Sequence, residues 1–178
     1  TDTAYRPNGG RHHVVVVGAG FGGLNTVQKL KNADVEITLI DKKNHHLFQP
    51  LLYQVATGIL SVGAVAPPTH LILRDQKNAT VVLGDVDTID VAAKKLHASA
   101  GHIDFDLEYD SLIVAAGANQ SYFGNDHFER WAPGMKTVDD ALAIRRKGGV
   151  RGDGRGLADG GLSPIEVDRH VIAQLLAG

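Results

Sequence analysis

Four consecutive valines, Val14 to Val17, lead directly into three glycines spaced as Gly18-x-Gly20-x-x-Gly23. A strand that is apolar on both faces is typical of a parallel sheet covered on both sides. The glycines predict a sharp turn at Gly18, close approach of the backbone to a phosphate at Gly20, and tight helix packing at Gly23. This order of features predicts a strand, a turn and a helix that together bind a dinucleotide.

The residues after the turn complete this unit. Leu24, Val27 and Leu30 recur at helical spacing, and a second apolar run over 35–40 ends on Asp41. The helix would direct its N-terminal N–H groups at the phosphates. An acid at this distance accepts hydrogen bonds from an adenosine ribose and repels a 2′-phosphate, which disfavours NADP. A glycine turn required only by the backbone is the alternative.

Composition indicates one soluble α/β chain of 178 residues. The net charge of −2 predicts no nucleic-acid partner. The sequence has no cysteine, which excludes disulfides, thiolate zinc sites and a redox dithiol, so electron transfer would need a bound cofactor. We expect a cytoplasmic location, because no apolar run of about 18 residues and no signal peptide are visible.

The histidines do not predict a metal site. His45 and His46 are adjacent, and no carboxylate or cysteine stands at ligand spacing near them. His12 and His13 are expected at the edge of the first strand. No histidine is assigned a catalytic role.

Periodicity and turn residues predict the remaining elements. A helix should follow Pro67 and Pro68 and run to about Gln76. We predict buried strands over 80–83 and 109–117, strands of a small antiparallel insertion over 86–107, and a helix over 137–147 capped by Thr137 and Asp140. The predicted fold class is α/β, a Rossmann-like parallel sheet with a small antiparallel β insertion.

Several segments carry a family resemblance when taken together. In chain order they are VVVVGAGFGGLNTVQKL, HHLFQPLLYQVATGIL, YDSLIVAAGANQSYFG and APGMKTVDDAL. Over about His12 to Arg146 the sequence resembles the N-terminal FAD-binding part of type II NADH:quinone dehydrogenases, above all actinobacterial ones. The resemblance implies an incomplete flavoprotein fold of the kind with two dinucleotide-binding domains, in which residues 1–147 form a partial FAD-binding domain.

The resemblance also implies which residues contact FAD. The pyrophosphate would lie at the glycine turn and the adenosine ribose at Asp41. The full set of expected cofactor-binding residues is Gly18, Gly20, Phe21, Gly22, Gly23, Asp41, Lys42, Gln49, Pro50, Leu51, Val86, Ala116 and Gly117. Val86, whose backbone would pair with the adenine edge, is equally well read as an ordinary strand residue. The segment 48–58 could instead be an apolar loop and short helix packed on the sheet, which is the favoured reading for Leu52, Val55 and Ile59.

In the complete enzymes of this family, electrons pass from NADH through the flavin to quinone. The resemblance therefore implies NADH and quinone as partners of a complete enzyme. Attachment to the inner face of the plasma membrane would depend on sequence absent here, and a homo-oligomer is left open. No catalytic acid or base is assigned. A single Rossmann domain that binds NAD, acting as a dehydrogenase or sensor, and a catalytically silent fragment are the alternatives.

The resemblance ends before the glycine-rich tract. Seven of the sixteen residues over 148–163 are glycine, which predicts a flexible linker. Residues 164–178 are expected to form a short C-terminal helix, because Ser163 and Glu166 match a capping box.

Overall fold

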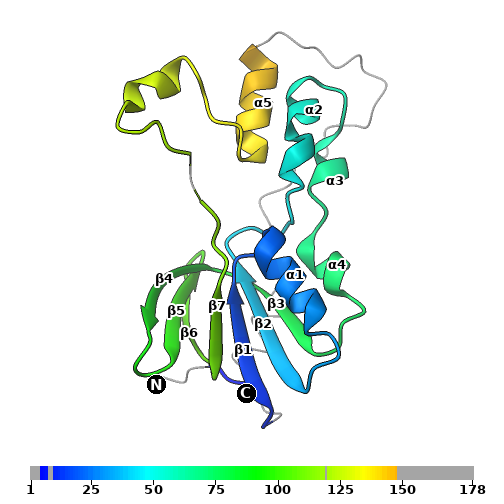
Figure 1. Ribbon diagram of the computed structural model, residues 1–178, viewed down its shortest axis with the longest axis vertical. Helices are drawn as coiled ribbons and strands as arrows, with labels where there is room; N and C mark the ends of the chain where they lie inside the picture. Colours follow the sequence, from blue (N-terminus) through cyan, green and yellow to red (C-terminus); the bar gives the residue numbers. More distant parts are fainter. Residues whose placement is uncertain (1–4, 8–9, 119, 148–178) are drawn as a thin grey trace. The chain divides into compact units, whose positions relative to one another are not determined.

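The computed structural model describes residues 5–7, 10–118 and 120–147 (Figure 1). They divide into two compact units, of which the first contains residues up to 45 and 68–117, and the second contains 46–67 and 118–147. The predicted linker over 148–163 and helix over 164–178 lie outside the described residues.

The first unit is built on a four-stranded parallel sheet. Its strands are β1 (His12–Val17), β2 (Val35–Asp41), β3 (Ala79–Leu83) and β7 (Ser111–Val114), in the order β3-β2-β1-β7. In the register, Val14 pairs with both Ile37 and Ser111. The predicted Rossmann-like sheet is confirmed.

Helix α1 (Phe21–Lys29) connects β1 to β2, and α4 (Thr69–Leu73) precedes β3. The helix predicted after Pro67 and Pro68 is therefore confirmed as α4, but it ends at Leu73, three residues before the predicted end at Gln76. Leu24 and Val27 of α1 are buried against Val16 of β1 in one apolar cluster. This cluster fixes α1 on one face of the sheet, and so fixes where its N-terminus points.

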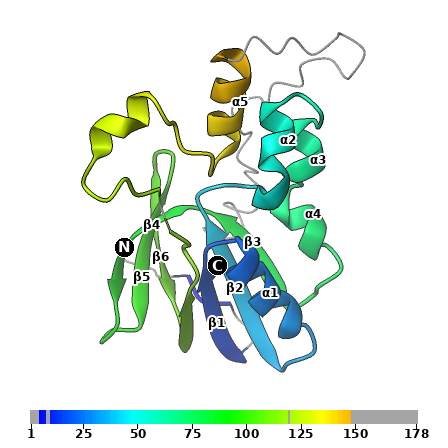
Figure 2. The same cartoon turned by 45° about the horizontal axis from the view of Figure 1, so that its top comes forward.

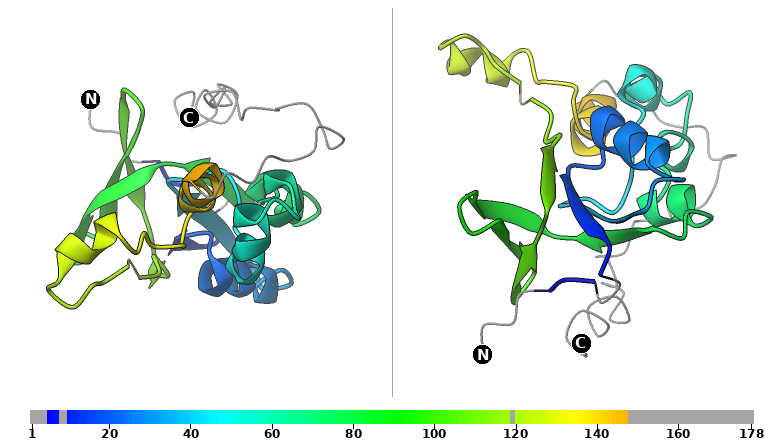
Figure 3. Two further views of the ribbon diagram at one scale, coloured as in Figure 1. Left: turned by 90° about the horizontal axis from the view of Figure 1, so that it is seen from above. Right: turned by 60° about the horizontal axis from the view of Figure 1, so that its bottom comes forward.

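A small antiparallel sheet covers the opposite face of the parallel one (Figure 3). It consists of β4 (Asp85–Asp90), β5 (Lys95–Ala100) and β6 (Ile103–Glu108), as the sequence predicts. Leu96 and Leu107 of this sheet are fully buried with Val15 and Ile40 of the parallel sheet. The central valine strand is thus covered on both faces, which explains why Val14 to Val16 are all apolar.

Two predicted buried strands are less buried than expected. In β3 only Val82 is buried, and in β7 Val114 is 62% exposed. Both strands lie at edges of the sheet, so each has one neighbouring strand among the described residues. An apolar run alone does not distinguish a central strand from an edge strand. The strand predicted over 109–117 is also shorter than expected, since β7 begins at Ser111 and ends at Val114.

The prediction for His13 was also wrong. Its side chain is buried rather than lying at a strand edge. Nδ1 is 2.6 Å from the Glu108 carbonyl oxygen and Nε2 is 2.9 Å from Thr38 Oγ1. Both ring nitrogens are thereby satisfied inside the core, which makes burial of this polar ring tolerable. His12 is exposed, as expected.

The second unit is helical (Figure 2). It contains η1 (Gln49–Leu51), α2 (Leu52–Ala56), α3 (Val62–Val65), η2 (Asp126–Arg130) and α5 (Val138–Lys147). Its core joins α2, α3 and α5 through the buried residues Leu52, Val55, Val65 and Ala141. Leu52 and Val55 are therefore core residues as favoured, and they pack on the other helices of this unit.

Two details of this unit bear on the sequence predictions. The capping box of α5 is confirmed, because the Asp140 N–H donates to Thr137 Oγ1 at 3.1 Å and the Thr137 N–H donates to Asp140 Oδ2 at 2.8 Å. The packing expected for Ile59 is wrong, since this side chain is 70% exposed.

Candidate nucleotide-binding site

The candidate site lies where the four parallel strands end. Gly18 follows β1, Asp41 ends β2, Gly84 follows β3 and Ala115 follows β7. Backbone bonds hold these ends together: Gly18 N–H donates to the Ile40 carbonyl at 2.7 Å, and Gly84 N–H donates to the Asp41 carbonyl at 3.0 Å. Open parallel sheets bind ligands at this carboxyl edge, next to the strand where the chain order reverses. In this sheet that strand is β1.

Two glycines of the turn are required by the fold itself. Gly18 has φ +101°, and a Cβ atom there would collide with the Ala115 carbonyl oxygen. A Cβ atom on Gly23 would collide with the carbonyl oxygen of Gly18. The predicted turn at Gly18 and the close packing at Gly23 are thus confirmed. The group that lies nearest to Gly23 is the carbonyl of Gly18, which belongs to the turn itself.

Gly20 is different, because the protein does not require a glycine at this position. It has φ −70° and ψ −168°, which any residue can adopt. A Cβ atom on Gly20 would meet no described heavy atom within 4 Å. The side-chain space of Gly20 is therefore open to a ligand.

This open space lies at the N-terminus of α1. Gly20 is the N-cap residue, so it offers no side chain to the first-turn N–H groups, and the first turn contains no acidic residue. Gly20, Phe21 and Gly22 are exposed. The first-turn N–H groups of a helix and the helix dipole together favour an anion at such a terminus.

Asp41 has a structural role that the sequence did not reveal. Its Oδ2 accepts the Ala19 N–H at 2.6 Å, and its Oδ1 accepts the Lys43 N–H at 2.7 Å. The carboxylate therefore ties the end of β2 to the glycine turn. Since two carboxylate oxygens offer about four acceptor positions, capacity remains for the hydroxyl groups of a ribose.

The end of β7 completes this edge. The Ala115 N–H donates to the Val17 carbonyl at 2.8 Å, and its methyl group lies 3.7 Å from the position of a Cβ atom on Gly22. Ala115 was not predicted as a site residue, although a small residue after an apolar strand is the signal that could have identified it. Ala116 and Gly117, which were predicted, follow it and are exposed.

The other predicted site residues belong to several different elements. Lys42 is exposed beside Asp41, and Val86 is half-buried in β4, where it pairs with Ala98. Gln49, Pro50 and Leu51 form η1 of the second unit. Their predicted contacts with a flavin stay predictions.

The described residues contain neither a candidate metal centre nor a candidate membrane span. No group of three or more histidine, aspartate or glutamate side chains there is arranged to hold a metal ion. No helix in the described part of the chain has both the length and the apolar character needed to cross a membrane.

Comparison with known proteins identifies the family. The family model for pyridine nucleotide-disulphide oxidoreductases matches residues 12–151. The chain is 63% identical over 137 residues to the type II NADH:quinone oxidoreductase NdhA of Mycobacterium tuberculosis, and 60% identical over 135 residues to Ndh of the same organism. These alignments cover 77% and 76% of the chain, respectively, and 29% of each relative.

Solved structures agree with this result. NDH2 from Plasmodium falciparum, solved in complex with RYL-552, superposes with a TM-score of 0.70 at 26% identity over 77% of this chain and 28% of its own. The sulfide:quinone oxidoreductase of Aquifex aeolicus superposes with a TM-score of 0.67 at 28% identity over 76% of this chain and 31% of its own. The chain thus spans about 29% of the length of the curated relatives named above. On the evidence of its sheet, its glycine turn and these matches, the chain belongs to the pyridine nucleotide-disulphide oxidoreductase family.

Proposed function

We propose that the turn between β1 and α1 binds the diphosphate of FAD, and that this chain is the FAD-binding part of an NADH:quinone oxidoreductase. The observation that carries the proposal is the open space at Gly20. The fold does not require a glycine at this position, whereas a phosphate that approaches the backbone here does require one. The identity of 63% to NdhA supports FAD and NADH chemistry for the complete protein.

The residues present fit the cofactor. The N-terminus of α1 suits the diphosphate, and the spare acceptor positions of Asp41 suit the ribose hydroxyls. The exposed backbone of Ala116 and Gly117 leaves room beside the turn. The residues that we expect to hold FAD are Gly18, Gly20, Phe21, Gly22, Gly23, Asp41, Lys42, Gln49, Pro50, Leu51, Val86, Ala116 and Gly117.

When bound, the flavin would supply the chemistry, by accepting hydride from NADH and passing electrons to quinone. The task of this chain is to orient the flavin by fixing its diphosphate and ribose. NADH and quinone would bind to the complete protein. For the complete protein, a cytoplasmic location at the inner face of the plasma membrane also belongs to this proposal.

Reconstitution tests the proposal directly. The purified chain is incubated with FAD or with NAD, separated from free ligand by gel filtration, and examined for bound nucleotide. We expect the flavin absorbance to elute with the protein. A folded chain, shown by circular dichroism, that retains NAD but no flavin would contradict the FAD assignment. A folded chain that retains neither would contradict nucleotide binding altogether.

A further inference from the structure

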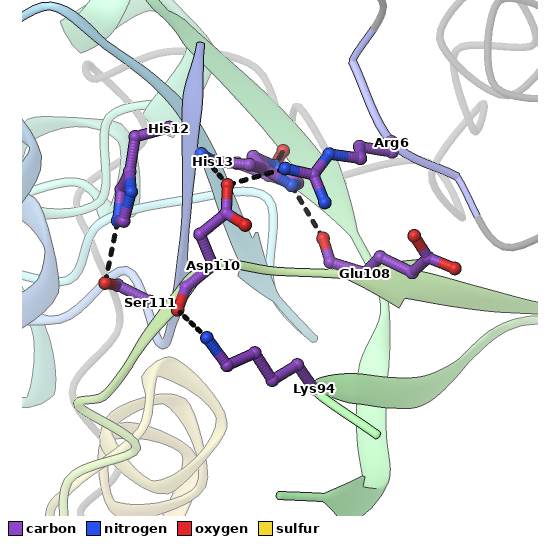
Figure 4. Close-up of polar contacts among 8 residues, drawn as sticks. Arg6, His12, His13, Lys94, Glu108, Asp110 and Ser111 are labelled. Carbon is purple, nitrogen blue, oxygen red and sulfur yellow. Dashed lines mark hydrogen bonds and ion pairs between the residues drawn. The ribbon is translucent and has the colours of Figure 1, made fainter. Parts of the chain in front are cut away.

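A cluster of polar groups lies at the amino ends of β1 and β7, at the edge opposite the glycine turn (Figure 4). Asp110 Oδ2 accepts the His13 N–H at 2.8 Å and Arg6 Nη2 at 2.7 Å. The Asp110 N–H donates to the His13 carbonyl at 2.9 Å. Asp110, the residue before β7, is therefore bonded to the same residue of β1 through its side chain and its backbone.

Further contacts surround this connection. His12 Nε2 and Ser111 Oγ are 2.8 Å apart across the two strands, and Lys94 Nζ donates to the Asp110 carbonyl at 3.3 Å. The bond from the His13 N–H, helped by Arg6, holds the pKa of the Asp110 carboxyl below its ordinary value. The carboxylate is thus charged at neutral pH, which strengthens the hydrogen bonds it accepts.

The apolar residues of β7 do not specify its register. Ile113 packs against the cluster that contains α1, and Leu112 packs against the cluster that contains the small sheet. Register is strongly specified where one face of a strand is apolar and the other polar, because a slip by one residue exchanges the faces. In β7 a slip that moves Ile113 and Val114 into the positions of Leu112 and Ile113 replaces each apolar residue by another. Strand β7 has four residues and one neighbouring strand among the described residues. Its register on β1 therefore needs a determinant other than its apolar side chains.

The register of β7 decides the geometry of the candidate site. In the observed register Val17 pairs with Val114, which places the Ala115 carbonyl where a Cβ atom on Gly18 would be. A slip by one residue moves a strand by about 3.3 Å along its neighbour. That displacement would remove Ala115 and Ala116 from the glycine turn.

We propose that Asp110 is a positioning residue for the FAD site, whose side-chain oxygen, by accepting the His13 N–H, fixes the register of β7 on β1 and so holds Ala115 and Ala116 against the glycine turn. The inference rests on the proposed function only for the identity of the ligand. The register itself is a property of the chain without ligand.

Three substitutions at Asp110 separate position from charge. Asp110→Asn keeps an oxygen that accepts the His13 N–H but removes the charge, Asp110→Glu keeps the charge but moves the carboxylate by one methylene, and Asp110→Ala removes both. Arg6→Gln is the control that removes only the exposed ion pair. Each full-length variant is titrated with FAD by flavin fluorescence, and hydrogen exchange is measured at the Ala115 amide, with the Ile37 amide of β2 as internal reference.

We expect Asp110→Asn and Arg6→Gln to bind FAD within a factor of about three of the parent, and the Glu and Ala variants to bind about tenfold more weakly. Exchange at Ala115 should accelerate in the Glu and Ala variants and remain slow in the Asn variant, while Ile37 is unchanged. If the Ala variant does not fold, the difference in FAD affinity and in Ala115 exchange between the Asn and Glu variants decides whether the inference holds.

Parent-like affinity and exchange in the Glu variant would overturn the inference. So would an Asn variant as defective as the Glu variant, because charge and not position would then be decisive. If the parent itself binds no FAD, the proposed function fails, whereas the exchange data still decide the role of Asp110.

Discussion

Substituting Gly20 tests whether the glycine turn is a ligand site or only a turn. In Gly20→Ala the new Cβ atom meets no described atom within 4 Å, and the φ of −70° suits alanine. Replacing glycine at such a compatible position stabilises a folded chain by about 0.4–1 kcal/mol, because the unfolded chain loses freedom. Glycine is a better N-cap than alanine, which offsets this gain, so the apo protein should be about as stable as the parent.

FAD binding, in contrast, should weaken. A methyl group in the open space at Gly20 would keep the diphosphate from the N–H groups of α1. Loss of one hydrogen bond to a charged group costs about 1.5–3 kcal/mol, which corresponds to roughly a 10- to 150-fold weaker affinity. Gly20→Val, with two further methyl groups, should abolish binding.

Gly23→Ala is the matched control. Its Cβ atom would collide with the carbonyl oxygen of Gly18, so this variant should lose stability by about 1–3 kcal/mol or fail to fold. Thermal unfolding of the apo chains and flavin fluorescence titration separate the two positions. The reasoning would be refuted by a Gly20→Val variant that binds FAD like the parent, or by one that is destabilised as much as Gly23→Ala.

Three other perturbations give defined outcomes. Asp41→Asn should lower the free energy of unfolding of the apo chain by about 1–2 kcal/mol, because one amide oxygen cannot replace both carboxylate oxygens; an unchanged urea midpoint would contradict this role. Thr137→Ala should cost about 1 kcal/mol through loss of the α5 cap, measured by urea unfolding, and equal stability would show that Asp140 caps the helix alone. Burial lowers the pKa of His13 from its ordinary 6.5, so the unfolded chain binds more protons and stability falls as the pH drops through 6.5 toward the lowered value. His13→Gln should flatten the dependence of the melting temperature on pH in that range, and an unaltered profile would assign the acid sensitivity elsewhere.

Local patterns predicted much of the fold because they reflect local physics. The valine strand, the glycine turn and the helix after it follow from apolar periodicity and from backbone freedom, which the sequence displays directly. The capping box at Thr137 was recognisable for the same reason, since both of its partners lie within one helical turn.

Predictions that depended on distant partners were less accurate. The burial of β3 and β7 was overestimated, because position at a sheet edge depends on strand order and not on strand composition. The burial of His13 depends on the Glu108 carbonyl and on Thr38, which are far from it in sequence. The contacts of Asp41 with the glycine turn were missed for the same reason.

The sequence by itself determined that this chain contains a strand, a glycine turn and a helix in the order typical of nucleotide-binding folds, because the required residue types lie within thirty residues of one another. Only the tertiary structure decided which glycines the fold requires. In the sequence, Gly18, Gly20 and Gly23 are the same residue type, and nothing there shows which of them the fold requires. They differ in what a Cβ atom would meet, and that depends on where β7 and α1 bring their backbones.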